Sequence, residues 1–172
     1  MTLLRTLAFT VVASLSPALA QGVTVWGGVG TEAFFSPQAT LGLSATAEHL
    51  GRVAVDVRGL GSLIALSVGS DPALAYSVTA DVLFSGNGSG LNVYGGPSVG
   101  VLGDLSGPSL APVWLFGGVG GIKGSFGSGS YGWFAEARAR IAYSGTQTSS
   151  SFNESLPFLP VAGLAVGVTY RF

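Results

Sequence analysis

The stretch 162–172, AGLAVGVTYRF, decides the fold class of this chain. Small or polar residues alternate there with apolar ones, which are Ala162, Leu164, Val166, Val168, Tyr170 and Phe172. Because successive side chains of a strand point to opposite faces, this alternation predicts a β-strand with one apolar face. The pattern continues to the last residue, whereas the termini of most domains are poorly ordered. We therefore expect a specific surrounding for the apolar face of this strand.

The first residues of the chain have the features of a secretory signal peptide. Residues 1–20, MTLLRTLAFTVVASLSPALA, contain Arg5, then an apolar segment, then the small-residue sequence Ala18-Leu19-Ala20. Serines and a proline interrupt the apolar run before it reaches the length of a membrane-spanning helix. The pattern predicts cleavage after Ala20 and export of residues 21–172. Since the sequence has no cysteine, the exported fold would contain no disulfide.

The composition of the chain does not suit an ordinary water-facing surface. Only 9% of the residues are charged, against about 25% in an average soluble domain. The chain is 48% hydrophobic, with a mean hydropathy of +0.57. Beyond residue 20 no uninterrupted apolar run is long enough for a membrane-spanning helix, and the 28 glycines argue against long helices. These features favour a transmembrane β-barrel, whose strands are apolar at alternate residues only.

Period-two patterns recur along the rest of the chain. In the third candidate strand, Val53, Val55 and Val57 alternate with charged or small residues. The candidate strands are 22–35, 39–49, 51–65, 73–85, 90–103, 112–123, 131–144 and 160–172. The sequence therefore predicts a single barrel domain over residues 21–172, an all-β, eight-stranded, antiparallel up-and-down transmembrane β-barrel.

The connections between these strands alternate in length. Short Gly/Ser/Asn-rich turns follow the second, fourth and sixth strands: EHLGR (48–52), SGNGSG (85–90) and GSFGSGS (124–130). Longer connections follow the third, fifth and seventh: SVGSDPA (67–73), GDLSGPSLAP (103–112) and GTQTSSSFNESLPFLP (145–160). The loop SPQ (36–38) after the first strand departs from this trend. Short periplasmic turns and longer extracellular loops are typical of outer-membrane barrels, so both termini should face the periplasm.

With these features, the chain resembles the small eight-stranded bacterial outer-membrane proteins over essentially all of residues 21–172. Proteins of that group typically end in a strand with a final Phe and apolar residues at alternate positions before it. The matching residues here are Phe172, Tyr170, Val168, Val166 and Leu164. The resemblance implies an outer-membrane location, contact with outer-membrane lipid, and recognition of the last strand by the outer-membrane assembly machinery. Another envelope protein is a further possible partner.

The few charged residues fall opposite the apolar face of their strands. They are Glu32, Asp56, Arg58, Asp81, Glu136, Arg138, Arg140 and Arg171. A lipid-facing Arg at mid-membrane would cost about 2–4 kcal/mol, so energetics and alternation agree that these side chains point inward. Side chains fill the interior of an eight-stranded barrel, and carboxylates and guanidiniums can pair there. We expect a neutralised polar core rather than an ion path or a proton relay, which is the alternative.

Two tryptophans and one proline raise questions about local structure. Trp26 and Trp114 fall on the face assigned to the interior, where Gly28, Gly30, Gly118 and Gly120 could make room for large rings. Pro97 lies inside the fifth predicted strand and has no N–H for the ladder. A bulge or a strand in two pieces would accommodate this proline.

The residue inventory gives little indication of catalysis. The single histidine, His49, falls in a predicted periplasmic turn, and the adjacent Glu48 would point to the opposite face. Without cysteine or a second histidine, no metal cluster is indicated. The GGVG segments at 27–30 and 117–120 lack the spacing and the following helix of a phosphate-binding loop. A formal net charge of −1 with no basic patch does not indicate a nucleic-acid partner. We predict no enzymatic activity, cofactor or metal.

Three functions remain open on the sequence alone. The favoured one is an integral outer-membrane barrel with a structural or envelope-anchoring role, plugged by side chains and not a diffusion pore. One alternative is a barrel enzyme acting on membrane lipid. The other is a secreted lipocalin-like binder of a small apolar ligand, which would require Arg58, Glu136, Arg138 and Arg140 to face water.

Overall fold

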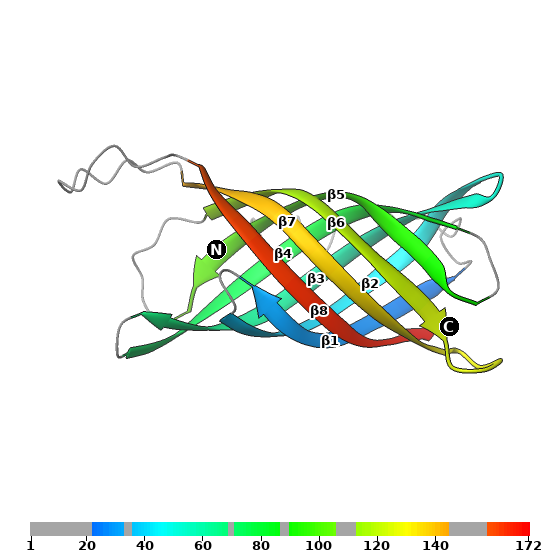
Figure 1. The fold of residues 1–172 in the computed structure, drawn as a ribbon, viewed down its shortest axis with the longest axis horizontal. Helices are drawn as coiled ribbons and strands as arrows, with labels where there is room; N and C mark the ends of the chain where they lie inside the picture. The colour runs from blue at the N-terminus through cyan, green and yellow to red at the C-terminus, as the bar shows by residue number, and fades with distance from the viewer. Residues whose placement is uncertain (1–21, 33–35, 69–70, 87–89, 106–112, 145–157) are drawn as a thin grey trace, which may run out of the picture.

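The chain folds into one closed antiparallel barrel (Figure 1). The computed structural model describes residues 22–32, 36–68, 71–86, 90–105, 113–144 and 158–172. Its strands are β1 (Val23–Glu32), β2 (Ser36–Leu50), β3 (Val53–Val68), β4 (Asp71–Gly86), β5 (Asn92–Asp104), β6 (Val113–Ser125), β7 (Tyr131–Ser144) and β8 (Phe158–Arg171). Each strand pairs with the next along the chain, and β1 pairs with β8 to close the barrel. The predicted fold class is confirmed, with strand ends that differ by a few residues. The predicted signal peptide lies outside the described residues.

The two ends of the barrel differ in their connections. At one end, here called the turn end, short turns join β2 to β3, β4 to β5 and β6 to β7, and β8 finishes (Figure 1). The opposite end, here called the loop end, carries the connections after β1, β3, β5 and β7. Gly51 and Gly127 have φ angles of +64° and +66° in turns at the turn end, a backbone conformation that glycine adopts without strain. No helix in the described part of the chain is long and apolar enough to cross a membrane.

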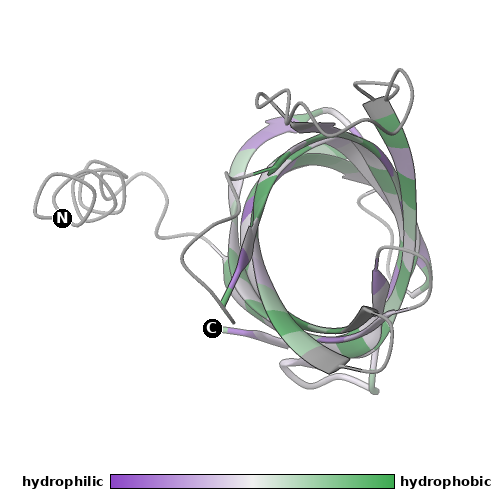
Figure 2. Ribbon diagram, turned by 90° about the vertical axis from the view of Figure 1, so that its left-hand side faces the viewer, coloured by the Kyte–Doolittle hydropathy of each residue, from purple (hydrophilic) through white to green (hydrophobic). Residues whose placement is uncertain are grey.

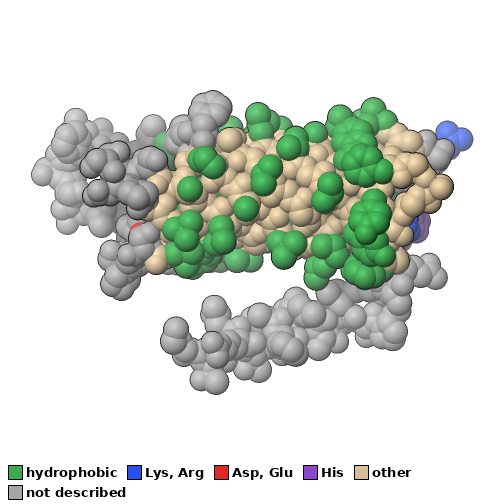
Figure 3. Space-filling model, turned by 90° about the horizontal axis from the view of Figure 1, so that it is seen from below, with side chains coloured by type: hydrophobic (Ala, Val, Ile, Leu, Met, Phe, Trp, Pro, Cys, Tyr) green, Lys and Arg blue, Asp and Glu red, His purple; other side chains and the backbone are tan. Residues whose placement is uncertain are grey.

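Alternation along the strands divides the side chains into an apolar outer set and a polar inner set. Leu41, Val29 and Leu164 point outward and are 67%, 61% and 59% exposed. On the face seen in Figure 3, hydrophobic side chains spread along the wall and charged ones appear only near its ends. Viewed along the barrel, hydrophilic and hydrophobic residues alternate around the closed ring of strands (Figure 2). The barrel is therefore apolar outside, and its interior holds the buried polar and charged side chains together with a cluster of buried rings and aliphatic groups.

The hairpin of β3 and β4 is longer than the sequence predicted. Pairing continues to Val68↔Asp71, so only residues 69–70 separate the strands where a longer loop was expected. The segment 59–69 is apolar on both faces: Leu63 points outward, whereas Leu60 and Ile64 point inward and are buried. Apolar side chains therefore suit both the outer face and the buried interior here, and the β3–β4 pairing continues through this segment. The predicted long loop after the third strand is therefore wrong.

Strand β2 differs from its prediction at both ends. Residues 36–38, expected to be a loop, begin the strand and pair with β1. Near its other end, a register shift between Thr46 and Glu48 marks a bulge. His49 pairs with Ala54 and is a strand residue, so its assignment to a turn is wrong. The bulge inserts one residue, a change that alternation alone cannot predict.

Pro97 is accommodated without a bulge or a break in the strand. The β5–β6 ladder runs through Pro97↔Gly118, whereas the β4–β5 ladder lacks pairs between Asp81↔Ser98 and Phe84↔Gly95. The register is the same on both sides of this interruption. Pro97 has no N–H to donate, so the discontinuity is local to one seam of the barrel.

The predicted inward position of Trp114 is wrong. Trp114 is 46% exposed and stacks on Phe116 outside the barrel, with ring centroids 6.2 Å apart. Its neighbour Leu115 points inward and is buried, so the predicted register of β6 was one residue out, and Gly118 and Gly120 also lie on the outer face.

Two inward glycines do make room for large rings. A Cβ atom on Gly28 would lie 2.8 Å from the ring of Phe134, and one on Gly121 would lie 2.9 Å from the ring of Tyr94. Together with the buried Trp26, these rings form the centre of the barrel core. Bare backbone at the two glycines therefore lets three aromatic rings share a narrow interior.

Candidate functional site

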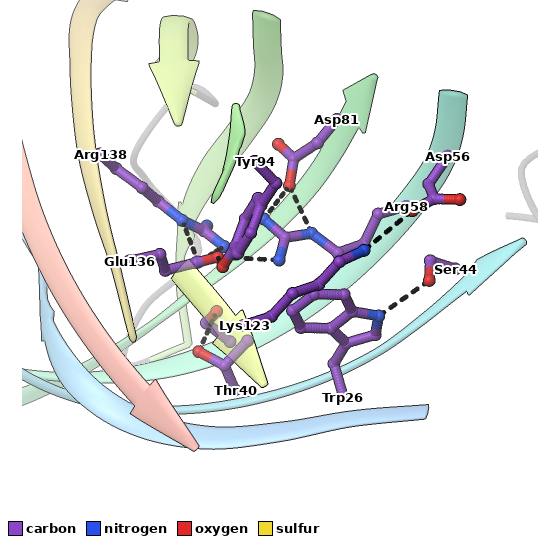
Figure 4. A network of polar contacts seen from close by, with 11 residues as sticks. Trp26, Thr40, Ser44, Asp56, Arg58, Asp81, Tyr94, Lys123, Glu136 and Arg138 are labelled. Carbon is purple, nitrogen blue, oxygen red and sulfur yellow. Dashed lines mark hydrogen bonds and ion pairs between the residues drawn. The ribbon is translucent and has the colours of Figure 1, made fainter. Parts of the chain in front are cut away.

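The centre of the barrel interior is organised around the guanidinium of Arg58 (Figure 4). Arg58 on β3 and Asp81 on β4 are direct cross-strand partners. Nε and Nη2 of Arg58 donate to Oδ2 of Asp81 at 2.9 and 2.7 Å. Nη1 donates across the lumen to Oε2 of Glu136 on β7 at 2.8 Å. The side chains of these three residues are 0–1% exposed, so one arginine holds two carboxylates away from water.

Glu136 is the second centre of the same network. Its Oε1 accepts from Nε and Nη2 of Arg138 at 2.9 and 2.6 Å. Its Oε2 accepts from the hydroxyl of Tyr94 at 2.7 Å, besides Arg58. Both oxygens of this buried carboxylate are thus engaged by charged or hydroxyl donors, which is how a buried charge is stabilised.

An aromatic wall supports the Arg58 guanidinium. Its Cζ lies 4.6 Å from the centroid of the Trp26 ring, within the range of a cation–π interaction. The Trp26 indole donates to Oγ of Ser44 at 2.8 Å, which fixes the ring. Trp26 also meets the rings of Phe134 and Tyr94 edge-on, at 5.0 and 5.8 Å between centroids. Packed aromatic rings therefore border the Arg58 network on this side.

Two further ion pairs lie on either side of this centre. Toward the loop end, Arg140 on β7 pairs with Glu32 on β1 and donates to Oγ1 of Thr79 at 3.2 Å. Toward the turn end, Nζ of Lys123 on β6 lies 3.2 Å from Oδ2 of Asp56 on β3. These pairs and the central network balance four acidic side chains, Glu32, Asp56, Asp81 and Glu136, with four basic ones, Arg58, Lys123, Arg138 and Arg140.

The structure brings most of the predicted inward charges together. Glu32, Asp56, Arg58, Asp81, Glu136, Arg138 and Arg140 are all buried and ion-paired. Arg171 is the exception: it lies near the end of β8 and is exposed at the mouth of the barrel, beside Gly22. Its predicted place in the interior network is wrong. An inward-pointing side chain at the end of a strand lies at the open mouth of the barrel and stays exposed.

Sequence reasoning missed Lys123 and Tyr94. The segment around Lys123 is rich in glycine, so its alternation is weak, and the error in the register of β6 hid which face Lys123 occupies. Tyr94 lies between Val93 and Gly95, where no charged neighbour marks the inner face. Placing β6 in the other register would have put Lys123 on the inner face, with the predicted inward carboxylates such as Asp56.

The possible catalytic groups of the interior are held apart. His49 is exposed at the turn end, and Glu48 pairs with the outward-facing Val55. Among the described residues no group of three or more His, Cys, Asp or Glu side chains is placed to hold a metal ion. The fold and the site thus define an eight-stranded barrel with an ion-paired interior.

Comparisons with solved structures extend this description. The chain is similar to the outer membrane enzyme PagL, with a TM-score of 0.53 and 14% identity over 87% of this chain and 99% of PagL. It is also similar to the Yersinia pestis outer membrane protein Ail, with a TM-score of 0.46 and 14% identity over 88% of this chain and 99% of Ail. No protein-family model matches the chain, and no curated protein sequence matches it. At this identity, the likeness to PagL establishes the fold alone.

Proposed function

We propose that this protein is an integral outer-membrane β-barrel with a structural or envelope-anchoring role, whose interior is plugged and does not form a diffusion pore. The observation that carries the proposal is the inversion of polarity between the two faces of the wall. Outward residues such as Val29, Leu41 and Leu164 are more than half exposed, whereas the paired charges are buried inside. Lipid is the solvent that suits such an outer face.

The ends of the apolar wall support the same proposal. At the turn end the rings of Tyr131, Tyr170 and Phe172 form a contiguous cluster, with 4.9 Å between the centroids of successive rings. At the loop end Trp114 and Phe116 stack on the outer face. Aromatic girdles of this kind mark the two interfaces that a membrane barrel crosses.

The interior supports a plug rather than a pore. An eight-stranded barrel is only wide enough for its own side chains, and here aromatic rings and paired charges occupy the centre. A charge that crossed this region would have to displace Arg58 from both carboxylates. A structural or anchoring role needs no such passage.

The two alternative functions have less support. A lipocalin-like binder needs apolar residues inside, but Arg58, Glu136, Arg138 and Arg140 are buried there. The enzyme alternative draws on the likeness to PagL, which is an outer membrane enzyme, and that likeness extends to the fold only. Glu48 and His49 face opposite sides of the wall, so the adjacent pair supplies no dyad.

Extraction of membranes tests the proposal. Isolated envelopes washed with high salt and then with carbonate should retain the protein, because its outer face is apolar. The retained protein should also migrate differently in unheated and boiled gel samples, as folded barrels do. Release into the wash, with the fold intact, would contradict membrane integration.

We further propose that the outer-membrane assembly machinery recognises the last strand through Phe172, Tyr170, Val168, Val166 and Leu164. The side chains of Leu164, Val166 and Val168 point outward and are more than half exposed, and Phe172 is 75% exposed. Replacing Phe172 with Asp should reduce the amount of folded barrel in the outer membrane, because an apolar recognition group is lost.

The measurement is the ratio of folded to unfolded protein in purified outer membranes, with Arg52→Asp in an exposed turn as the control. Equal ratios for wild type and Phe172→Asp would contradict the role of the last residue. A pull-down from detergent-solubilised membranes would show whether another envelope protein accompanies the barrel.

A further inference from the structure

We propose that a chamber at the turn end of the barrel binds small oxyanions, carboxylates or phosphates, through Lys123 at its floor and Arg171 at its mouth. The chamber has a volume of about 620 Å³. That volume lies within the range of about 300–1,000 Å³ that is usual for ligand sites. This inference goes beyond the proposed structural role and does not depend on which compartment the turn end faces.

Within the described residues, a chamber opens into the lumen at the turn end. At the turn end the chamber reaches inward as far as Trp26, Asp56 and Lys123. The central network of Arg58 and Glu136 lies beyond this floor (Figure 4). Toward the loop end the inward side chains are buried: the apolar Ile64, Leu115 and Ala75 are 0%, 1% and 2% exposed, and the polar Glu32 and Gln38 are 1% and 6% exposed. In the described part of the chain, a polar ligand could therefore reach the lumen between the turns.

The more exposed charged group at the floor is the ammonium of Lys123. Both oxygens of Asp56 are engaged, Oδ1 by the hydroxyl of Thr46 at 2.7 Å and Oδ2 by Lys123 at 3.2 Å. An ammonium group has three N–H donors, and the side chain of Lys123 is 26% exposed, against 8% for Asp56. An incoming ligand would thus meet the more exposed ammonium of Lys123 before the Asp56 carboxylate, whose two oxygens each already accept a hydrogen bond. This favours a ligand rich in acceptors.

A side-chain-free strip of wall lies between the strands of the two cations. Lys123 is on β6 and Arg171 is on β8, and Gly132 of the intervening strand β7 lines the chamber with no side chain of its own. The direct cross-strand partners of Gly132 are Ser125 on β6 and Thr169 on β8. A Cβ at this glycine would lie 2.6 Å from Oγ1 of Thr169. The backbone O of Gly124 lies at the same distance of 2.6 Å, so these two oxygens fill the space beside the glycine. An anion between the two cations would therefore lie farther into the chamber.

The rest of the lining suits a small hydrophilic ligand rather than a lipid chain. The hydroxyl residues Thr24, Ser44 and Ser85 line the wall, and His49 and Phe172 complete the mouth. Each hydroxyl can both donate and accept, so the wall adapts to the hydroxyl or oxygen groups of a ligand. The preference for anions comes from the two cations, Lys123 and Arg171. The one acidic side chain in the lining, Asp56, already accepts from Thr46 and Lys123.

Titration of the folded barrel in detergent micelles tests this site. The probes are inorganic phosphate and citrate at constant ionic strength, with glucose as the neutral control. We expect a dissociation constant of about 1 mM or tighter for at least one oxyanion and no saturable binding of glucose. The tighter of the two probes identifies the preferred oxyanion class. Lys123 is the one lysine of the sequence, so bound oxyanion should also protect it from an amine-reactive reagent.

Three variants separate a specific site from general attraction. Lys123→Gln should weaken oxyanion binding about tenfold or more, and Arg171→Gln should weaken it less because this side chain lies at the mouth. Arg52→Gln removes the same charge from an exposed turn outside the chamber lining and should leave binding within about twofold. Folded yield of each variant is checked by its gel migration before titration.

A fourth variant makes the proposal falsifiable even if Lys123→Gln folds poorly. Asp56→Asn removes the negative charge that holds Lys123, so it should tighten oxyanion binding several-fold while it lowers stability. Loss of binding in Asp56→Asn, equal weakening by Arg52→Gln, or no saturable binding of either oxyanion to the wild type would each overturn the proposal.

Discussion

Replacing Arg58 with alanine is expected to lower the free energy of unfolding by about 3–5 kcal/mol, because it leaves buried carboxylates without their cation. Arg58 pairs with Asp81 on the neighbouring strand at 2.7 Å and with Glu136 across the lumen at 2.8 Å. The substitution also removes the cation–π contact between Arg58 and the Trp26 ring. No other basic side chain among the described residues is paired with Asp81.

Denaturant unfolding of the refolded barrel in micelles measures this effect. Arg52→Ala, in the exposed β2–β3 turn, should change stability by less than about 0.5 kcal/mol. The loss of stability in Arg138→Ala should lie between those of Arg58→Ala and Arg52→Ala. Arg138 is ion-paired with Glu136, and Glu136 would still accept hydrogen bonds from Arg58 and Tyr94. If Arg58→Ala were as stable as Arg52→Ala, the network would contribute nothing to the stability of the interior.

Replacing Val166 with arginine is expected to destabilise the membrane-inserted barrel by about 2–4 kcal/mol, because the new charge would face the middle of the lipid layer. Val166 points outward from β8 and is 56% exposed. It pairs with Val29 on β1 and Ala135 on β7, all on the apolar outer face. If the outer face were in contact with water instead, the substitution should change the free energy of unfolding by about 0.5 kcal/mol or less.

A second Val→Arg substitution provides the matched control. Val93 is 69% exposed on the outer face but lies near the start of β5, next to a turn. An arginine there reaches the interface, where the penalty falls to about 0–1 kcal/mol. Unfolding is measured in lipid bilayers and in micelles. A Val166→Arg penalty no larger than that of Val93→Arg would contradict the membrane position of the wall.

The fold could be predicted from the sequence because a two-sided wall imposes a strict alternation. In β4, Tyr76, Val78 and Phe84 fall on the outer face, and no loop or helix interrupts the pattern within the strand. Features that add or remove one residue could not be predicted in this way. The bulge near Glu48 and the register of β6 are set by local backbone geometry, and glycine-rich segments have too few side chains to show their faces.

The site could be predicted in part, for a related reason. Charges such as Asp56, Arg138 and Arg140 stand out because a lipid-facing position would be costly for them. Which acid pairs with which base depends on how the strands are staggered around the barrel, as the contact of Arg58 with Glu136 shows. Tyr94 belongs to the network through a hydroxyl that carries no charge, so alternation alone gave no reason to choose it.

Conductance of the purified barrel in planar lipid bilayers tests most directly whether the ion-paired interior closes the barrel. We predict no steady unitary conductance from the wild type, because Arg58, Glu136 and the surrounding rings fill the lumen between the turn-end chamber and the buried side chains toward the loop end. Steady, reproducible unitary currents from correctly folded protein would contradict the plugged barrel and make the buried arginines the lining of a pore.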